Sequence, residues 1–545
     1  MEIQKLDEQF SVSAQLSIDD LDALAAAHVE ILVCNRPDEE AADQPSFAEI
    51  EAAAKARGMV AIQLAFKPAD LTRELVDELG HLITTGKKIH GYCRTGNRST
   101  NIWAASQLNQ GKSLAAIASE TSPTGFDVTG FLQQAQVSGL VDRPGDGVVI
   151  VGAGSAGIAL AASLKKRDPQ LHITLIDPSS EHYYQPGWTM VGAGVFNSAS
   201  TRRATRDLIP AGVTWQQQSV VSFDPANNQI RLDNGETVRY QQLVVCPGLK
   251  LDWSAVAGLE ESLGKNGVTS NYRYDLAPYT WELVNTLQGG RAVFTQPPMP
   301  IKCAGAPQKA LYLSADAWFR RGVLKDINVD FYNAGAALFG VAHYVPALME
   351  YVEKYQAKLH FQQTLVKVDG ANQKAWFTST DAAGEPQETC VEFDMLHVCP
   401  PQCAPDFVKD SELADANGWL DVDQATLRHQ RFDNIWGLGD VLNAPNAKTM
   451  AAARKQVPVV ADNLVSAMQA RALTASYDGY GSCPLTVERG KIVLAEFGYG
   501  GKLLPTFPAW LNNGARPTRL AWLLKTYALP TVYWHLMLKG REWLT

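Results

Sequence analysis

Short apolar runs alternate with helical spacings along the first quarter of the chain. The run VEILVC (residues 29–34) stops before a proline and predicts a strand followed by a loop. The segment FAEIEAAAKARG (residues 47–58) has helical spacing and ends in glycine, which predicts a helix. The runs MVAIQLAF and KKIHGYC predict two further strands. Residues 1–136 are therefore expected to form a small α/β domain.

A second α/β region starts at the apolar strand GVVIV, residues 147–151. From there strands and helices alternate to about residue 470, which predicts Rossmann-type units over residues 147–470. Residues 137–146 are polar and contain Gly and Pro, so they are expected to be a linker. Residues 471–545 differ in composition, because they hold four of the thirteen tryptophans with Lys and Arg between them.

Composition narrows the classes of function. A chain of 545 residues with 46% apolar residues predicts several folded domains, and its net charge of −9 argues against nucleic-acid binding. The polar start MEIQKLDEQF is not expected to be a secretory signal, and no apolar run is long enough for a spanning helix. The eight cysteines contain no CxxC pair and no cluster with metal-ligand spacing, so no metal site is expected.

A glycine-rich turn follows the strand at residue 147. Gly152, Gly154 and Gly157 form GxGxxG, in which the glycines permit a tight turn, the approach of a pyrophosphate and close packing of helix on strand. Ala156 belongs to the same turn. Asp177 ends the next strand, twenty residues after Gly157, where a carboxylate can bind ribose hydroxyls. This order predicts a dinucleotide site, and the motif alone leaves FAD and NAD open.

Several segments together resemble the sulfide:quinone oxidoreductases, particularly the branch that includes the mitochondrial enzyme. They are EHYYQPGWTMVGAG, IKCAGAPQKALYLS, DMLHVCPPQ, GWLDVDQATLRH, NAKTMAAARKQ and YDGYGSCPL with LAEFGY. The resemblance covers about residues 146–545. It implies an α/β fold with tandem FAD/NAD-binding domains, FAD as cofactor, and sulfide and a quinone as substrates.

The resemblance also implies which residues hold the flavin. The late segment IWGLGDV resembles the second FAD fingerprint of such flavoproteins, whose aspartate, here Asp440, contacts the ribityl chain. A helix N-cap is the alternative role for Asp440. Gln185 and Gly248 are expected beside the flavin, and Lys448 or Lys455 is expected to stabilise its reduced form, because positive charge near N1 favours the anion.

Cys303 is the expected catalytic thiol. It lies in the segment IKCAGAPQK after an apolar strand, and the neighbouring Lys302 favours a thiolate. The resemblance implies that this thiolate attacks the flavin or holds a sulfane sulfur after sulfide attacks a disulfide or trisulfide.

A second redox cysteine is also implied, directly after the Gly-Asp fingerprint, but Val441 stands there. Cys399 and Cys403 are the candidates to replace it, and Cys399 is preferred because it lies next to a strand. Cys483 is expected to be structural. If neither candidate pairs with Cys303, the enzyme needs an external thiol or a polysulfide on Cys303 alone.

The C-terminal region has two stretches with apolar residues at helical spacing, separated by Pro530. The first runs from Leu520 to Leu529 and the second from Val532 to Leu538. Each is too short to span a bilayer, and their Trp, Tyr, Lys and Arg residues suit a membrane interface. The resemblance implies paired amphipathic helices that lie on the membrane and admit a quinone, and core or dimer-interface helices are the alternative. The expected location is cytoplasmic, peripheral on the inner face of the cell membrane.

A second cysteine loop occurs in the N-terminal domain. Cys93 to Ser99 follow a predicted strand and precede a predicted helix, so loop amides and the helix N-terminus form an anion site that lowers a thiol pKa. Arg98 is expected to clamp the anion. Four residues separate Cys93 from Arg98, whereas tyrosine phosphatases place five there. Residues 6–136 resemble a small family of phosphatase-fold, rhodanese-like sulfurtransferases (the beta-lactamase-hydrolase-like family), and phosphatase activity stays open.

The main hypothesis is sequential. Sulfide reduces the Cys303 centre and FAD, a quinone reoxidises FAD, and Cys93 carries the sulfane sulfur to a thiol such as glutathione. One alternative is an NAD(P)H-dependent disulfide, polysulfide or quinone reductase of the same fold. Another is a redox-sensing, membrane-associated flavoprotein. The oligomeric state stays open, with a homo-oligomer possible.

Overall fold

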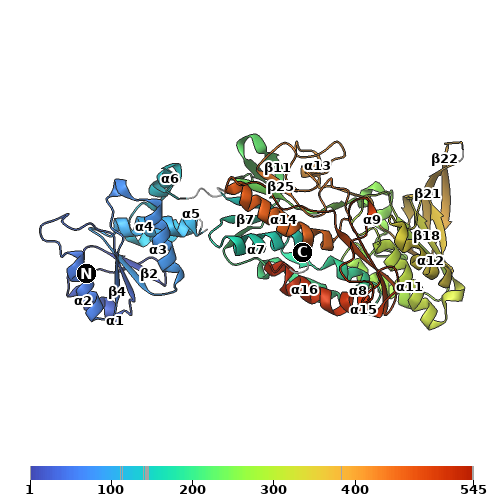
Figure 1. Ribbon diagram of the computed structural model, residues 1–545, viewed down its shortest axis with the longest axis horizontal. Coiled ribbons are helices and arrows are strands. Elements are labelled where there is room, and N and C mark those ends of the chain that lie inside the picture. Colours follow the sequence, from blue (N-terminus) through green and yellow to red (C-terminus); the bar gives the residue numbers. More distant parts are fainter. Residues whose placement is uncertain are drawn as a thin grey trace. The chain divides into compact units, whose positions relative to one another are not determined.

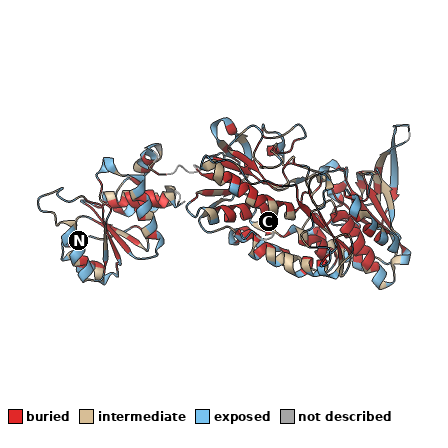
Figure 2. Ribbon diagram, in the orientation of Figure 1, coloured by how far each residue is buried: buried red, intermediate tan, exposed pale blue. Residues whose placement is uncertain are grey.

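The computed structural model describes residues 2–110, 112, 114–138, 140–141, 147–381 and 383–542. The chain divides into two compact units, residues 1–146 and 147–545 (Figure 1). The expected linker, residues 137–146, falls largely outside the described residues. Both units are α/β, as the sequence predicts, with buried central strands and exposed outer faces on the helices (Figure 2).

The first unit is built on a five-stranded sheet with the order β1–β2–β5–β3–β4, parallel except at the β1 edge. Alternating residues of β3 enter two different cores, with Val33 beside Trp103 and Leu32 beside Tyr92, so helices cover both faces. The strands are β1 Gln4–Lys5, β2 Phe10–Ser13, β3 Ile31–Cys34, β4 Val60–Gln63 and β5 Ile89–Tyr92. The helices are α1 Asp20–Ala26, α2 Phe47–Ala56, α3 Arg73–Thr84, α4 Asn97–Asn109, α5 Leu114–Thr121 and α6 Val128–Ser138.

The second unit begins with a parallel sheet in the order β10–β7–β6–β14–β25. The edge strand β25 comes from far along the chain. It pairs with β14, which precedes it by about 190 residues. Helices α7 and α14 pack against each other beside this sheet. The elements are β6 Val148–Val151, α7 Ser155–Arg167, β7 Ile173–Ile176, β10 Val213–Gln216, β14 Gln242–Val245, β25 Ile435–Gly437 and α14 Met450–Met468.

A second parallel sheet has the order β16–β23–β17–β18–β19. Helix α11 packs against β17 on one side and against the hairpin β26–β27 on the other. The bounds are β16 Val268–Thr269, α10 Leu276–Thr286, β17 Gly290–Gln296, α11 Ala306–Arg321, β18 Ile327–Asn333, α12 Val345–Lys354, β19 Lys358–Phe361, β23 Met395–His397, β26 Gly481–Glu488 and β27 Lys491–Phe497.

Smaller elements complete the second unit. Two three-stranded antiparallel sheets consist of β11 Val220–Asp224, β12 Gln229–Leu232 and β13 Thr237–Arg239, and of β20 Thr364–Asp369, β21 Lys374–Thr380 and β22 Pro386–Glu392. Two strand pairs are β8 Glu181–Tyr183 with β9 Arg202–Ala204, and β15 Lys250–Leu251 with β24 Gln402–Cys403. The short helices are α8 Trp188–Val191, α9 Leu259–Ser262 and α13 Asp406–Lys409.

The C-terminal segment folds back onto the dinucleotide-binding helix. It consists of α15 Arg519–Leu523, a π-helical turn Leu524–Ala528 and α16 Leu529–His535. Glu542 forms an ion pair with Arg167 of α7 at 2.6 Å, and Lys166 Nζ donates to the Gly540 carbonyl at 2.8 Å. These contacts fix the end of the chain to the back of α7.

This arrangement differs from the expectation that both apolar stretches face a membrane. In the second stretch Tyr533, Trp534 and Leu538 are buried, because they pack into the core around α7. In the first stretch Leu520, Leu523 and Tyr527 stay exposed. Only the first stretch therefore offers an apolar surface.

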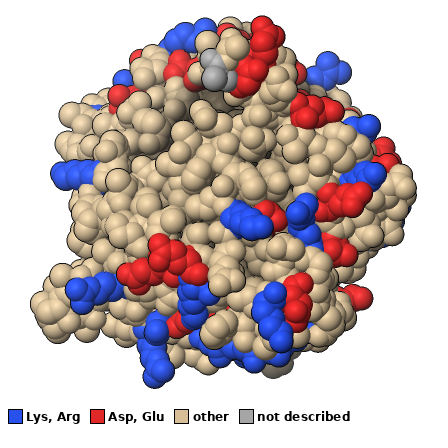
Figure 3. All heavy atoms as spheres, turned by 90° about the vertical axis from the view of Figure 1, so that its right-hand side faces the viewer, with Lys and Arg blue, Asp and Glu red and all other residues tan. Residues whose placement is uncertain are grey.

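No helix in the described ranges is both long and apolar enough to cross a membrane. Figure 3 shows one face of the molecule on which uncharged side chains occupy most of the middle, with acidic and basic side chains mixed around its edges. On this face the acidic excess of the sequence is not gathered into a single patch.

Candidate functional site

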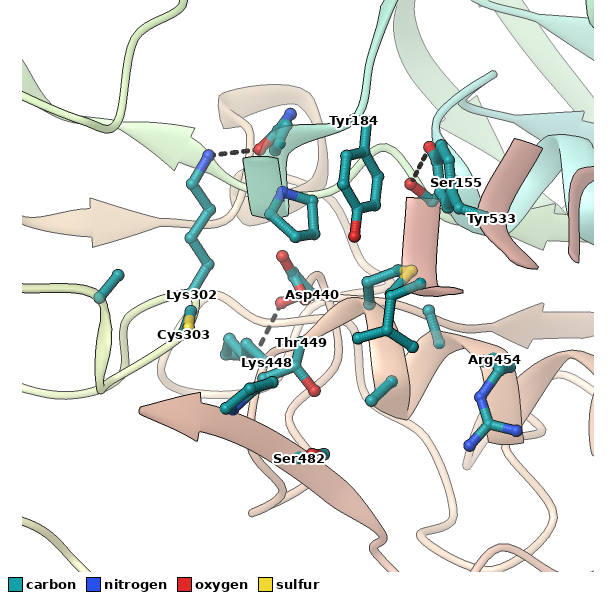
Figure 4. Close-up of a pocket in the computed structure, with 18 of the residues that line it drawn as sticks. Ser155, Tyr184, Lys302, Cys303, Asp440, Lys448, Thr449, Arg454, Ser482 and Tyr533 are labelled. Atoms are coloured by element: carbon teal, nitrogen blue, oxygen red, sulfur yellow. Dashed lines mark hydrogen bonds between the residues drawn. The ribbon is translucent and has the colours of Figure 1, made fainter. Parts of the chain in front are cut away.

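A cavity of about 320 Å³ in the second unit brings together segments that are far apart in the sequence. In Figure 4 Ser155, Asp440 and Tyr533 lie around it with the thiol-bearing loop. Lys302 Nζ donates to Gln185 Oε1 at 2.7 Å across one side. Six residues that the sequence predicts for the site line the cavity: Gly154, Ala156, Gln185, Gly248, Cys303 and Asp440.

The glycine-rich turn has the shape that a dinucleotide requires. Gly152 has a φ of 109°, and a Cβ there would lie 2.5 Å from the Cys246 carbonyl oxygen. A Cβ on Gly157 would lie 1.8 Å from the Gly152 carbonyl oxygen, so α7 packs on the turn without side chains between them. A Cβ on Gly154 would meet nothing within 4 Å. The start of α7 is therefore open to a pyrophosphate, whose charge its free N–H groups favour.

Two further residues brace this turn. Asp177 accepts hydrogen bonds from the backbone N–H groups of Ala153 at 2.7 Å and Ser179 at 2.8 Å, while burial raises its pKa. The Tyr533 hydroxyl lies 2.7 Å from Ser155 Oγ and 2.5 Å from a ring nitrogen of His182. The C-terminal segment thus reaches the phosphate-binding end of the cavity, which sequence reasoning missed because it assigned Tyr533 to a membrane-facing stretch.

One of the two candidate lysines reaches the cavity. Lys448 lines it, and its Nζ donates to the carbonyl oxygens of Asp440 and Leu442, each at 2.7 Å. Burial lowers the pKa of Lys448 to about 8 and raises that of Asp440. Lys455 lies outside the cavity wall, 5.3 Å from the centre of the Tyr480 ring. The geometry therefore favours Lys448 over Lys455 as the cation beside a bound cofactor.

Two thiols meet beside the cavity: Cys303 lines its wall, and Cys483 is buried outside it. Cys303 Sγ lies 3.8 Å from Cys483 Sγ, which exceeds the length of an S–S bond, about 2.05 Å, by less than 2 Å. Cys303 has a φ of 50°, a conformation that is rare outside glycine and often marks functional sites. Gly305 permits this approach, because a Cβ there would lie 2.3 Å from Leu485 on the same hairpin strand as Cys483.

Two lysines surround the thiol pair. Lys309, on the first turn of α11, donates from Nζ to Cys303 Sγ at 2.9 Å. The hydrogen bond from Cys483 and the Lys309 charge hold the pKa of Cys303 well below its usual range, although burial acts in the opposite direction. The same hydrogen bond, together with burial, raises the pKa of Cys483 well above its usual range. The pair is therefore polarised, with a thiolate at Cys303 and a thiol at Cys483.

The second lysine comes from the C-terminal segment. The π-helical turn directs Lys525 inward, where its Nζ donates to Thr486 Oγ1 at 3.0 Å. Burial and the charge of Lys309 lower the pKa of Lys525 well below its usual range. π-Helical turns often occur at functional sites, and this one places the Lys525 amine near the thiols from a segment whose neighbours Leu523 and Tyr527 are exposed.

The expectation that Cys399 or Cys403 pairs with Cys303 stays a prediction. Cys399 is buried outside the cavity wall, in a small apolar cluster against which Cys303 also packs, and burial raises its pKa to about 12. Cys403 lies on β24, also outside the cavity wall. Cys483, which was expected to be structural, is the thiol that meets Cys303. No sequence motif indicates this pairing, because the hairpin β26–β27 delivers Cys483 from 180 residues away.

The cysteine loop of the first unit has a geometry suited to anions. Cys93 is buried at the end of β5, and the backbone N–H of Gly96 donates to its Sγ at 3.2 Å. Helix α4 starts directly afterwards, so its N-terminus faces the same loop. Arg98 donates to both carboxylate oxygens of Glu40, at 3.0 and 2.7 Å, and to the Phe66 carbonyl. Burial opposes the Arg98 charge, but Glu40 and Cys93 outweigh it and raise its pKa.

Comparisons with known proteins agree with this division. The family described as "Beta-lactamase hydrolase-like protein, phosphatase-like domain" matches residues 2–110, and "Pyridine nucleotide-disulphide oxidoreductase" matches residues 146–279. The mitochondrial sulfide:quinone oxidoreductase of Dictyostelium discoideum is 40% identical over 397 residues, covering 72% of this chain and 86% of that protein. The mitochondrial sulfide:quinone oxidoreductase of Mus musculus is 37% identical over 394 residues, with the same two coverages of 72% and 86%.

A solved structure shows the same fold. The sulfide:quinone oxidoreductase from Aquifex aeolicus aligns with a TM-score of 0.59 and 20% identity, covering 73% of this chain and 91% of that chain.

Replacing Lys309 tests the polarised thiol pair. Lys309→Met removes the ammonium group 2.9 Å from Cys303 Sγ, so the pKa of Cys303 is expected to rise. After reduction, alkylation of the Cys303 peptide by iodoacetamide at neutral pH is expected to slow about tenfold for each unit of that rise. Mass spectrometry across a pH series measures the rate of this alkylation. The matched variant Lys367→Met, on the distant strand β20, is expected to leave the profile unchanged. An unchanged profile in Lys309→Met would contradict the assignment.

Proposed function

The chain belongs to the mitochondrial-type sulfide:quinone oxidoreductase family, and on this premise we propose that Cys303 and Cys483 form the redox centre at which it oxidises sulfide. The observation that carries the proposal is the 3.8 Å separation of the two Sγ atoms, because Cys303 lines the cavity that also holds a dinucleotide-binding turn. The enzyme is an FAD-dependent oxidoreductase with a quinone as electron acceptor. The electrons released at the thiols pass to the quinone through FAD.

The polarised pair gives the reaction a direction. In the oxidised state the two cysteines form a disulfide, which HS⁻ attacks at the Cys483 sulfur. This breaks the S–S bond, leaves a persulfide on Cys483 and releases Cys303 as a thiolate. Cys303 is the better leaving group, because the Lys309 ammonium lies 2.9 Å from its sulfur and stabilises the departing thiolate. The same Lys309 ammonium favours the entry of an anionic nucleophile.

The cycle closes when an acceptor thiol takes the outer sulfur from Cys483. The dithiol that remains returns to the disulfide and gives up the two electrons that the quinone receives in the overall reaction. The overall reaction is H₂S + RSH + quinone → RSSH + quinol. Bound FAD supplies the two-electron acceptor that links the thiols to the quinone.

Residues of this chain fit FAD along the length of the cavity. The open start of α7 at Gly154 and Ser155 would hold the pyrophosphate, with Asp177 towards the adenosine ribose. Asp440 and Lys448 would face the flavin end with Gly248 and Gln185, all of which line the cavity.

The N-terminal unit is proposed to pass the sulfane sulfur on. Cys93 takes the outer sulfur from a persulfide by thiolate attack, and a thiol such as glutathione then removes it from Cys93. The Gly96 N–H and the start of α4 stabilise the thiolate. Arg98 orients an anionic donor, although Glu40 already binds its guanidinium. The phosphatase-like description of the matching family keeps phosphate esters as the alternative substrates.

A membrane surface is proposed as the source of the quinone. Exposed apolar side chains gather in one stretch of the sequence, and Arg516 and Arg519 lie exposed within it. Such a mixture suits an interface with anionic lipid. The proposed location is peripheral, on the inner face of the cell membrane. The apolar residues are Leu503, Trp510, Leu511, Leu520, Leu523 and Tyr527.

Loss of either thiol tests the redox centre. Cys303→Ser and Cys483→Ser are each expected to abolish sulfide-driven bleaching of the flavin, with decylubiquinone reduction at least about 10³-fold slower, because no disulfide can form. Anaerobic stopped-flow absorbance measures the bleaching. The control Cys390→Ser changes an exposed cysteine on β22 and is expected to behave as wild type. Normal bleaching in Cys483→Ser, or bleaching of the wild type by NADH and not by sulfide, would refute the proposal.

Cys93 is expected to act only in the transfer step. Cys93→Ser should leave decylubiquinone reduction within about twofold of wild type when sulfite or glutathione accepts sulfur directly. It should abolish sulfur transfer from thiosulfate to a thiol, because a serine hydroxyl in place of the Cys93 thiol cannot carry a persulfide sulfur. Persulfide formation is followed by cold cyanolysis. Hydrolysis of p-nitrophenyl phosphate with no thiosulfate activity would instead support a phosphatase.

The exposed stretch is expected to bind lipid. The double variant Leu523→Gln with Tyr527→Gln removes apolar side chains that are 51% and 67% exposed, so folding should be unaffected. Co-sedimentation with vesicles containing anionic lipid is expected to fall about tenfold or more. Phe319→Gln removes a side chain of similar exposure, 52%, from α11 and serves as the control. Equal sedimentation of all three proteins would argue against this surface.

A further inference from the structure

The hairpin end of the cavity holds a buried carboxylate that the sulfur chemistry does not use. Glu496 on β27 is 5% exposed and lines the cavity. The Tyr480 hydroxyl donates to its Oε1 at 2.6 Å, and the backbone N–H of Thr506 donates to its Oε2 at 3.1 Å. The Thr506 hydroxyl donates to Oε1 as well. A buried acid with this many fixed donors has one orientation, with its carboxylate at the cavity wall.

The backbone of Glu496 is held as firmly as its side chain. The Tyr344 hydroxyl accepts from the Glu496 N–H at 3.0 Å and donates to the Glu496 carbonyl at 3.0 Å. Tyr480 also contacts Arg454 of α14, and burial lowers the pKa of Arg454. Figure 4 shows Arg454 and Ser482 at this end of the cavity.

Apolar side chains share the wall around Glu496 with a few polar ones. Leu494, Phe507, Leu524, Leu529 and Val532 line it, together with Arg454, Ser482 and Thr506. A largely apolar wall with a few fixed polar groups is the usual form of a site for a flat, largely apolar molecule. Among the substrates of the proposed reaction, the quinone has this character. The wall also includes residues beside the exposed stretch 503–527, from which a membrane quinone would enter.

Reduction of a quinone to a quinol consumes two electrons and two protons. The anionic reduced flavin that a cation near N1 favours would supply two electrons and one proton, so one further proton must come from another donor. In a largely apolar cavity a fixed side chain is a better donor than bulk water. We propose that Glu496 relays this proton: its carboxylate takes a proton from water, and that O–H bond breaks as the quinol O–H bond forms. Tyr480 and Thr506 act as positioning residues. The inference rests on the proposed sulfide:quinone reaction.

The decisive experiment compares two electron acceptors. Decylubiquinone takes up protons on reduction, whereas ferricyanide takes only electrons. For Glu496→Gln, kcat with decylubiquinone is expected to fall about 10²-fold or more, the size of a lost general acid. Its sulfide-driven flavin bleaching and its ferricyanide reduction are expected to stay within about twofold of wild type. Tyr480→Phe and Thr506→Val are expected to give smaller losses with decylubiquinone alone.

Glu488→Gln is the matched control, because it makes the same change on the same hairpin, at a residue paired with Lys354 outside the cavity. It is expected to match wild type with both acceptors. Three results for Glu496→Gln would overturn the inference: an unchanged quinone rate, an equal loss with ferricyanide, or a raised KM with unchanged kcat. If sulfide does not bleach the flavin of the wild-type protein, the proposed function itself is refuted. The two failures are therefore distinguishable.

Discussion

The contact between the Lys309 ammonium and the Cys303 sulfur is the interaction on which the rest of the site depends. At 2.9 Å in a buried wall it makes one of two neighbouring thiols a thiolate and leaves the other protonated. Without this asymmetry, attack on the disulfide would have no preferred sulfur. The contact in turn requires α11 to start beside the hairpin β26–β27, and Gly305 permits that approach. The packing of the backbone therefore determines which of the two sulfur atoms is attacked and which one leaves.

A single stretch at the end of the chain connects three functions. Lys525 reaches the thiols, Tyr533 reaches the phosphate-binding turn, and Leu523 and Tyr527 remain outside. The π-helical turn makes this possible, because its wider spacing lets neighbouring residues face opposite directions. The cavity is thus bounded on one side by the same segment that carries the exposed apolar surface.

Local order in the sequence was enough to predict some parts of the molecule and not others. The turn at Gly152–Gly154–Gly157 and the α/β fold follow from strands, glycines and helices in sequence, and the structure confirms that fold. The approach of Cys483 to Cys303 could not be predicted, because Cys483 arrives through the packing of a hairpin 180 residues away. The inward side of α16 was missed for a related reason. A helix with Tyr, Trp and Leu on one face has the same pattern whether that face meets lipid or protein.

The bond between Tyr533 and Ser155 has a consequence for how the enzyme matures. The two residues are 378 positions apart, and one lies in the first strand–helix unit of its domain while the other lies close to the end of the chain. During synthesis the glycine turn leaves the ribosome long before the residue that closes over it. The nascent chain therefore carries this turn without its Tyr533 contact until that residue has been synthesised. A chain that stops before Tyr533 lacks the hydroxyl group that contacts Ser155 at the start of α7.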